Sequence, residues 1–129
     1  MPILNVADDT FIVGDPRVVA RLVNDPIRHQ LWWPQLSLNV SRDRGRVGVE
    51  WTVNGVWAGQ SWVGSMEMWL EPVLDGVVLH HYVRLDPVGR SLTDKQVAAL
   101  NVTYATDWKR HVFALKDAVE STRSVGAES

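Results

Sequence analysis

The sequence contains no cysteine among its 129 residues, which excludes disulfides, a thiolate nucleophile and cysteine-ligated metal sites. No apolar run approaches the 18 or more residues of a membrane-spanning helix. The start, MPILNVADD, lacks the basic residues and long apolar stretch of a signal peptide. A strong charge of one sign is also lacking: the net charge of −2 gives no electrostatic reason to expect nucleic acid or an anionic membrane as partner. We therefore expect a cytoplasmic protein without membrane insertion or nucleic-acid binding.

What the sequence has in excess is tryptophan, with seven tryptophans against two phenylalanines. Each tryptophan can bury about 150–250 Å², so a large aromatic core is expected. Hydrophobic residues make up 46% and charged residues 22% of the chain, which is typical of a globular protein. The length fits one domain, and we place it at residues 1–122, followed by a disordered tail at 123–129.

The first part of the chain predicts a strand and then short helices. Residues 3–13 read as a strand that is broken at Asp8-Asp9. Asp15 as N-cap and Pro16 at the first helical position then predict a helix, and Asn24-Asp25-Pro26 ends it. A turn or a second short helix follows at residues 27–30, just before the stretch HQLWWPQL.

Three dipeptides predict the turns of an antiparallel sheet. Asn54-Gly55 and Asp75-Gly76 are strong signals for two-residue hairpin turns, and Arg44-Gly45 is a weaker one. These turns set a register for each hairpin. The central pairs are Leu38 with Trp51, Trp51 with Ala58, and Met68 with Val83.

The same register divides the side chains between two faces of the sheet. One face is apolar and carries neither a carboxylate nor an arginine. The other face has opposite charges and paired aromatic rings as cross-strand neighbours, with Trp69 opposite Tyr82, a pair that also offers a homodimer contact. The residues predicted on this outer face, away from the last helix, are Glu67, Trp69, Glu71, His80, Tyr82 and Arg84.

A long helix ends the domain. Thr93 and Gln96 form a capping box at its start. The side chains that recur at helical spacing predict one buried stripe, formed by Val97, Leu100, Tyr104, Trp108, Val112, Leu115 and Val119.

This order of elements resembles the START-like (SRPBCC) superfamily, and within it the polyketide cyclase/dehydrase and lipid-transport group. The stretches that carry the likeness are FIVGDPRVVARLVNDPIRHQLWWPQL, GSMEMWLEPVLDGVVLHHYVRLDP and WKRHVFALKDAVE. The resemblance implies an α+β helix-grip fold: a curved antiparallel sheet of five to seven strands wrapped round a long C-terminal helix, with one or two short helices after the first strand. It also implies an apolar cavity between the sheet and that helix.

In this arrangement LWWP lies over one end of the cavity. Either one of the two tryptophans faces inward as a lid, or both only fill the end of the core. The candidates for lining the cavity are Trp32, Trp33, Trp51, Gln60, Trp62, Met66, Met68, His81, Val83, Tyr104, Trp108 and His111.

Sites for a metal or a covalent intermediate are poorly supported, and we expect neither a metal nor a cofactor. His80 and His81 are adjacent on a strand and point to opposite faces, so they do not share an ion. A Gly-x-Ser-x-Gly nucleophile elbow is missing. The polar groups on the apolar face, Gln60, His81, Tyr104 and His111, either orient a ligand, act as acid or base, or simply bond within the core.

Three functions remain open. The first is binding of a small hydrophobic or amphipathic molecule, lipid- or polyketide-like. The second is an aromatase/cyclase or dehydratase that acts on a polyketide-like substrate in the same cavity. The third is an interaction protein whose cavity has collapsed. An open cavity above roughly 300 Å³ favours the first two, and a filled one favours the third.

Overall fold

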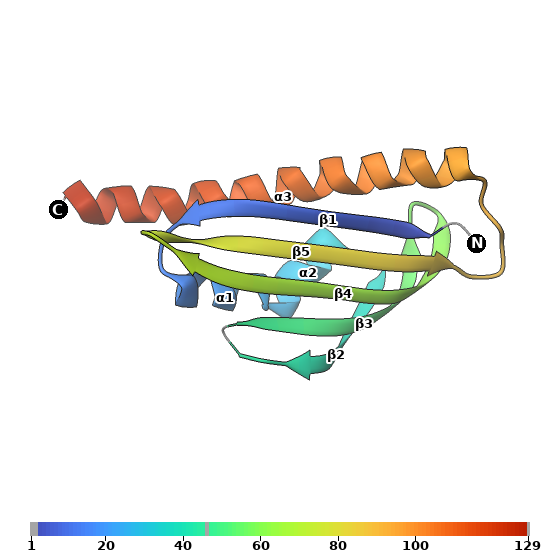
Figure 1. Cartoon of the computed structure of the whole chain (residues 1–129), viewed down its shortest axis with the longest axis horizontal. Helices are drawn as coiled ribbons and strands as arrows, with labels where there is room; N and C mark the ends of the chain where they lie inside the picture. Colours follow the sequence, from blue (N-terminus) through green and yellow to red (C-terminus); the bar gives the residue numbers. More distant parts are fainter. Residues whose placement is uncertain (1–2, 46, 129) are drawn as a thin grey trace.

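Five strands and three helices follow one another along the residues that the computed structural model describes, 3–45 and 47–128, of which the side chains of 122–128 are not described. In chain order they are β1 (Leu4–Val13), α1 (Pro16–Val23), α2 (Pro26–Trp32), β2 (Leu36–Asp43), β3 (Gly48–Trp57), β4 (Gln60–Val73), β5 (Gly76–Pro87) and α3 (Asp94–Glu128). The strands form one antiparallel sheet in the order β1-β5-β4-β3-β2, and α3 runs along β1 (Figure 1). This is the predicted helix-grip arrangement, with five strands. The tail predicted at 123–129 lies outside the described side chains and stays a prediction.

The two short helices begin as their caps predict. Asp15 accepts a hydrogen bond from the Arg17 amide (2.8 Å) at the start of α1. Asp25 caps α2 in the same way, since it accepts a hydrogen bond from the Ile27 amide (2.9 Å). Each cap is followed by a proline at the first helical position. The second helix is longer than the predicted 27–30, since α2 extends over Pro26–Trp32. Trp32 and Trp33 therefore lie at the end of a helix.

The break predicted in the first strand at Asp8-Asp9 is wrong. β1 is continuous and pairs with β5 along its whole length, with Asp8 opposite His81 and Asp9 opposite His80. Both carboxylates have partners that offset the cost of placing aspartate in a strand. Asp8 faces α3, where it pairs with Lys109, and Asp9 contacts His80. Long-range pairing has outweighed the low strand propensity of aspartate.

The turn predicted at Asn54-Gly55 is also wrong. β3 continues through both residues, and the chain reverses at Ala58-Gly59, so that β4 begins at Gln60. Ala58 and Gly59 have φ values of 53° and 71°, and positive φ at both central residues is what a type I′ hairpin turn requires. The pairing of Trp51 with Ala58 is replaced by Trp51 with Met66.

Gly55 serves the contact between strands and not a turn. Where β3 passes the start of β2, the Val56 amide donates to the Gln35 carbonyl (2.9 Å). A Cβ at Gly55 would lie 2.3 Å from that same oxygen, so only glycine permits this close approach.

The other two hairpins are shifted by two residues from the predicted register. Leu38 lies opposite Val53 instead of Trp51, and Met68 lies opposite His81 instead of Val83. The first shift accompanies a bulge between Val40 and Arg42, and the second places the β4–β5 turn at Leu74-Asp75. The direct pairing of Trp69 with Tyr82 is therefore wrong, since Trp69 faces His80.

On β4 and β5 the shifts move the pairing by an even number of residues, so the side chains of these strands keep their predicted faces. On β3 the lost turn moves Val56 from the predicted apolar face to the exposed outer one, and beyond the bulge in β2 the shift is odd, with Arg42 opposite Glu50. β4 and β5 alternate between buried side chains that face the core and more exposed ones. The predicted outer set is confirmed: Glu67, Trp69, Glu71, His80, Tyr82 and Arg84.

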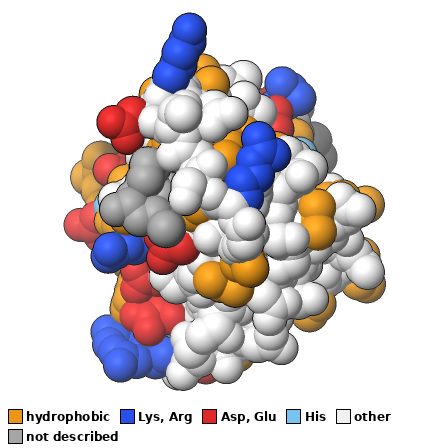
Figure 2. Space-filling view, turned by 90° about the vertical axis from the view of Figure 1, so that its right-hand side faces the viewer, with side chains coloured by type: hydrophobic (Ala, Val, Ile, Leu, Met, Phe, Trp, Pro, Cys, Tyr) orange, Lys and Arg blue, Asp and Glu red, His pale blue; other side chains and the backbone are white. Residues whose placement is uncertain are grey.

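α3 starts at the predicted capping box. The Thr93 amide donates to Gln96 Oε1 (2.9 Å), and the Gln96 amide donates to Thr93 Oγ1 (3.1 Å). Its predicted stripe is buried except for Leu100, which is half-buried. Within the described part of the chain, no helix is long and apolar enough to cross a membrane. At the end of the molecule shown in Figure 2, basic and acidic side chains are interspersed with small separate hydrophobic groups.

Candidate functional site

The predicted residues from α2, β5 and α3 form one cluster of rings behind the sheet. Trp33 stacks on Trp108, with ring centres 6.0 Å apart and planes at 10°, and His81 lies 4.1 Å from Trp108. Trp33 is buried at 3% exposure, whereas Trp32 is half-buried and covers Trp108 and His111. Trp33 is thus the inward member of the LWWP pair.

The other predicted residues are buried around this cluster. They are Trp51, Gln60, Trp62, Met66, Met68 and Val83. The Gln60 amide donates to the carbonyls of Ser61 (2.9 Å) and Val88 (3.2 Å), and no hydrogen bond joins it to His81 or Tyr104. The Trp62 indole donates to the Trp57 carbonyl. These contacts fill the centre of the space between the sheet and α3.

His81 and Tyr104 form a buried polar pair in this core. The ring nitrogen Nδ1 of His81 lies 3.2 Å from the Glu67 carbonyl, which only accepts, so Nδ1 carries the proton. Nε2 then accepts from the Tyr104 hydroxyl at 2.8 Å. Complete burial lowers the pKa of His81 to about 4, and burial raises the pKa of Tyr104 well above its usual value. At neutral pH both groups are uncharged, with their hydrogen bonds satisfied.

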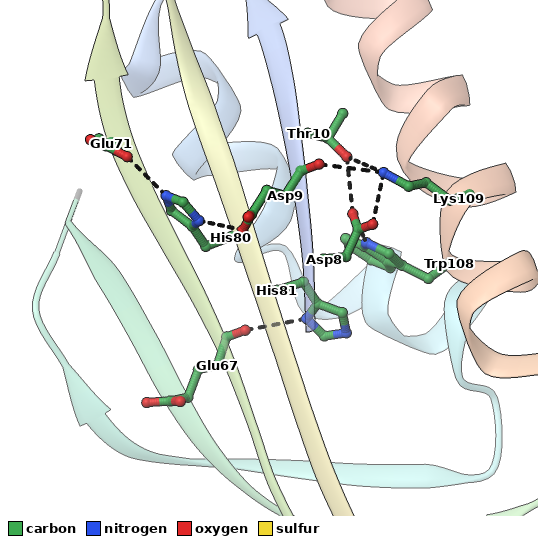
Figure 3. A network of polar contacts seen from close by, with 9 residues as sticks. All are labelled: Asp8, Asp9, Thr10, Glu67, Glu71, His80, His81, Trp108 and Lys109. Atoms are coloured by element: carbon green, nitrogen blue, oxygen red, sulfur yellow. Dashed lines mark hydrogen bonds and ion pairs between the residues drawn. The ribbon is translucent and has the colours of Figure 1, made fainter. Parts of the chain in front are cut away.

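A carboxylate lies on the inner side of β1, contrary to the expectation of an apolar face without one. Asp8 accepts from the Trp108 indole (3.0 Å) and pairs with Lys109 (2.7 Å), as Figure 3 shows. Lys109 also donates to Thr10 (3.0 Å). The network joins β1 to α3 and fixes the orientation of the Trp108 ring. This network was not predicted because the strand was expected to break at Asp8-Asp9.

His80 belongs to a separate network on the outer face. Its ring contacts Asp9 (2.5 Å) and Glu71 (3.0 Å), which flank it on the neighbouring strands (Figure 3). Partial burial lowers the pKa of His80, but the hydrogen bonds and charges of Asp9 and Glu71 outweigh it, and the net shift is upward. Among the described residues, no group of three or more histidine and carboxylate side chains is arranged to hold a metal ion. Self-association through the face of Trp69 and Tyr82 stays a prediction.

A groove opens at the end of the molecule where α1, the β4–β5 turn and the C-terminal half of α3 meet. Its volume is about 750 Å³. Most of its lining is apolar: Val18 and Leu22 from α1, Pro72 and Leu74 from the β4–β5 hairpin, and Ala118 and Val119 from α3. Asp15, Asp75 and Arg28 supply its charged groups. We call this space the α1–α3 groove.

The residues of this groove differ from the predicted cavity residues. Val119 was expected only in the buried stripe of α3, and Val18 and Leu22 only as part of the first helix. One local signal was available, because Val18 and Leu22 stand four apart and share a helix face. Leu74 gave no such signal. It is 96% exposed with φ of 54°, and its place in the groove follows from the shifted β4–β5 turn.

Neither a search of family models nor a search of curated proteins finds a match to this sequence. Solved structures do match. A START superfamily protein from Mycobacterium smegmatis aligns over 92% of this chain and 98% of its own, with a TM-score of 0.53 and 12% identity. The Aha1 dimer from Colwellia psychrerythraea aligns over 90% and 96%, with a TM-score of 0.60 and 18% identity. This chain has the START-like helix-grip fold.

The same fold occurs in the di-domain ARO/CYC StfQ from the steffimycin biosynthetic pathway. That structure aligns over 95% of this chain but 52% of its own length, with a TM-score of 0.57 and 11% identity. At such low identities the likeness concerns the helix-grip fold alone. Activity and ligand have to be argued from the side chains of this chain.

Proposed function

We propose that this helix-grip protein binds a small hydrophobic or amphipathic molecule, lipid- or polyketide-like, in the α1–α3 groove. The predicted space among the rings is filled, which taken alone favours the interaction protein, but the α1–α3 groove carries the proposal of binding because it offers about 750 Å³ lined mainly by apolar side chains. Ligand pockets in proteins span about 300–1,000 Å³ and have this mixture of apolar walls with few polar groups.

Two features of the groove support binding in energetic terms. A ligand that buries about 200 Å² of apolar surface there gains roughly 5 kcal/mol before the costs of association. Leu74 stands in the left-handed region at φ 54° and is almost fully exposed. That conformation is the one a two-residue hairpin turn requires, and it holds an apolar side chain in water at the groove, where a ligand would bury it.

The geometry favours binding over catalysis. His81 and Tyr104, the predicted candidates for acid–base chemistry on the inner face, are 0% and 2% exposed and are covered by rings. Neither lines the α1–α3 groove. An aromatase/cyclase would need its acid and base within hydrogen-bond reach of the substrate.

A neutral apolar dye, N-phenyl-1-naphthylamine, tests the proposal. We expect it to bind the protein with increased emission, and Val18→Trp to reduce its affinity because the larger side chain occupies the groove. The matched control is Val102→Trp on α3, where the valine is 67% exposed and does not line the groove. Dye affinity that is equal in the wild type and both variants would refute the groove as the site.

A further inference from the structure

The α1–α3 groove carries one basic group among its described lining residues, Arg28 of α2. The arginine lies half-buried beside a mainly apolar wall. No carboxylate of the described residues is within ion-pair distance of it. Asp15, which also lines the groove, pairs with Arg17 (2.8 Å).

The guanidinium of Arg28 has an unmet hydrogen-bond requirement. Its Nε is shielded from solvent and has no hydrogen-bond partner. A buried N–H without a partner is unfavourable, the more so on a charged group. Because Nε lies beneath the chain itself, a molecule in the groove meets the terminal N–H groups of Arg28, for which no carboxylate of the described residues supplies a partner.

From this we propose that the ligand of the α1–α3 groove is a carboxylate-bearing amphiphile whose headgroup pairs with Arg28. This inference rests on the proposed function and names its ligand class. A carboxylate offers two oxygens in one plane, which match the N–H groups of the two terminal nitrogens of a guanidinium in a bidentate pair. The apolar tail then lies against Val18, Leu22 and Val119.

The charges of the groove favour a carboxylate over a phosphate monoester. Arg28 is the one basic group among the described residues that line the groove. A phosphate monoester carries about −1.5 to −2 charges at pH 7, whereas a carboxylate carries one. A single arginine therefore compensates the charge of a carboxylate in full and leaves part of the charge of a phosphate monoester uncompensated.

Competition against N-phenyl-1-naphthylamine at pH 7.5 tests the inference, with decanoate, decan-1-ol and decyl phosphate as competitors of equal chain length. We expect decanoate to bind at least about tenfold more tightly than decan-1-ol, the ratio for a hydrogen bond to a charged group. Decyl phosphate should bind no more tightly than decanoate. Arg28→Met should remove the advantage of decanoate while decan-1-ol binds as before, and Arg28→Lys should keep part of it.

Arg21→Met on the exposed side of α1 is the control, and it should leave the advantage intact. Equal affinities of decanoate and decan-1-ol for the wild type, or an advantage that survives Arg28→Met, would overturn the assignment of Arg28. Tighter binding of decyl phosphate would overturn the choice of carboxylate. If the dye and decan-1-ol do not bind at all, the proposed function fails together with this inference.

Discussion

At the scale of single residues, His81 couples the core to pH. Its pKa in the folded protein is about 4 because it is buried, against 6.5 for an exposed histidine. As the pH falls from about 6.5 to about 4, the unfolded chain takes up a proton that the folded protein does not. Stability is therefore complete above pH 6.5 and falls through this window, by roughly 3 kcal/mol at most for this residue.

His81→Gln should accordingly flatten the loss of stability between pH 6.5 and 4.5, measured by urea unfolding at several pH values. His29 and His111, whose pKa values burial also lowers, contribute in the same direction and remain. His80→Gln is the comparison: its raised pKa adds stability that is present below about pH 6.5 and is lost as the pH rises through the folded pKa, so its removal should lower stability throughout this window without flattening the slope. An unchanged slope in His81→Gln would contradict a neutral buried imidazole.

At the scale of elements, the turn between β3 and β4 shows a conflict between local and long-range preferences. Ala58 occupies a position with φ of 53°, which disfavours alanine and suits asparagine. Ala58→Asn should raise the free energy of unfolding by about 0.5–1 kcal/mol, measured by urea denaturation. Asn54→Ala, in a regular strand position, serves as the comparison and should bring no such gain. If Asn54→Ala weakened the protein as a lost turn would, the hairpin would have to reverse at Asn54-Gly55 after all.

The elements themselves could be predicted, and their exact pairing could not. The N-caps Asp15 and Thr93 marked helix starts because capping depends on a few neighbouring residues. The inner and outer faces followed from alternation, which survives any even shift of register. The predicted turn at Asn54-Gly55 was wrong because the local preference of these two residues for a turn is outweighed by the pairing of β3 with the strands on both sides. That pairing joins distant segments and cannot be read from one stretch of sequence.

At the scale of the whole molecule, the aromatic cluster was predictable and the groove was not. The spacing of Tyr104 and Trp108 on one helix face, and the alternation that placed His81 inward, were sufficient to bring these side chains together. The α1–α3 groove depends on how far α3 extends past the sheet and on where α1 lies (Figure 1). Both follow from packing between segments distant in sequence, which brings Val18 and Val119 to the same groove.

The separation between aromatic core and groove gives a test of the whole arrangement. Because Trp33 is stacked within the core and does not line the groove, Trp33→Phe should cost about 1–3 kcal/mol in urea unfolding yet leave the affinity for N-phenyl-1-naphthylamine unchanged.

The dye should also stabilise the wild type against unfolding, by about 2.7 kcal/mol at a hundredfold excess over Kd, and slow amide exchange in α1 and the β4–β5 turn. Trp32→Phe, altered at the rim of the same cluster, should behave like Trp33→Phe toward the dye at a smaller loss of stability. A dye affinity that falls in Trp33→Phe but not in Val18→Trp would place the ligand between sheet and α3, among the rings.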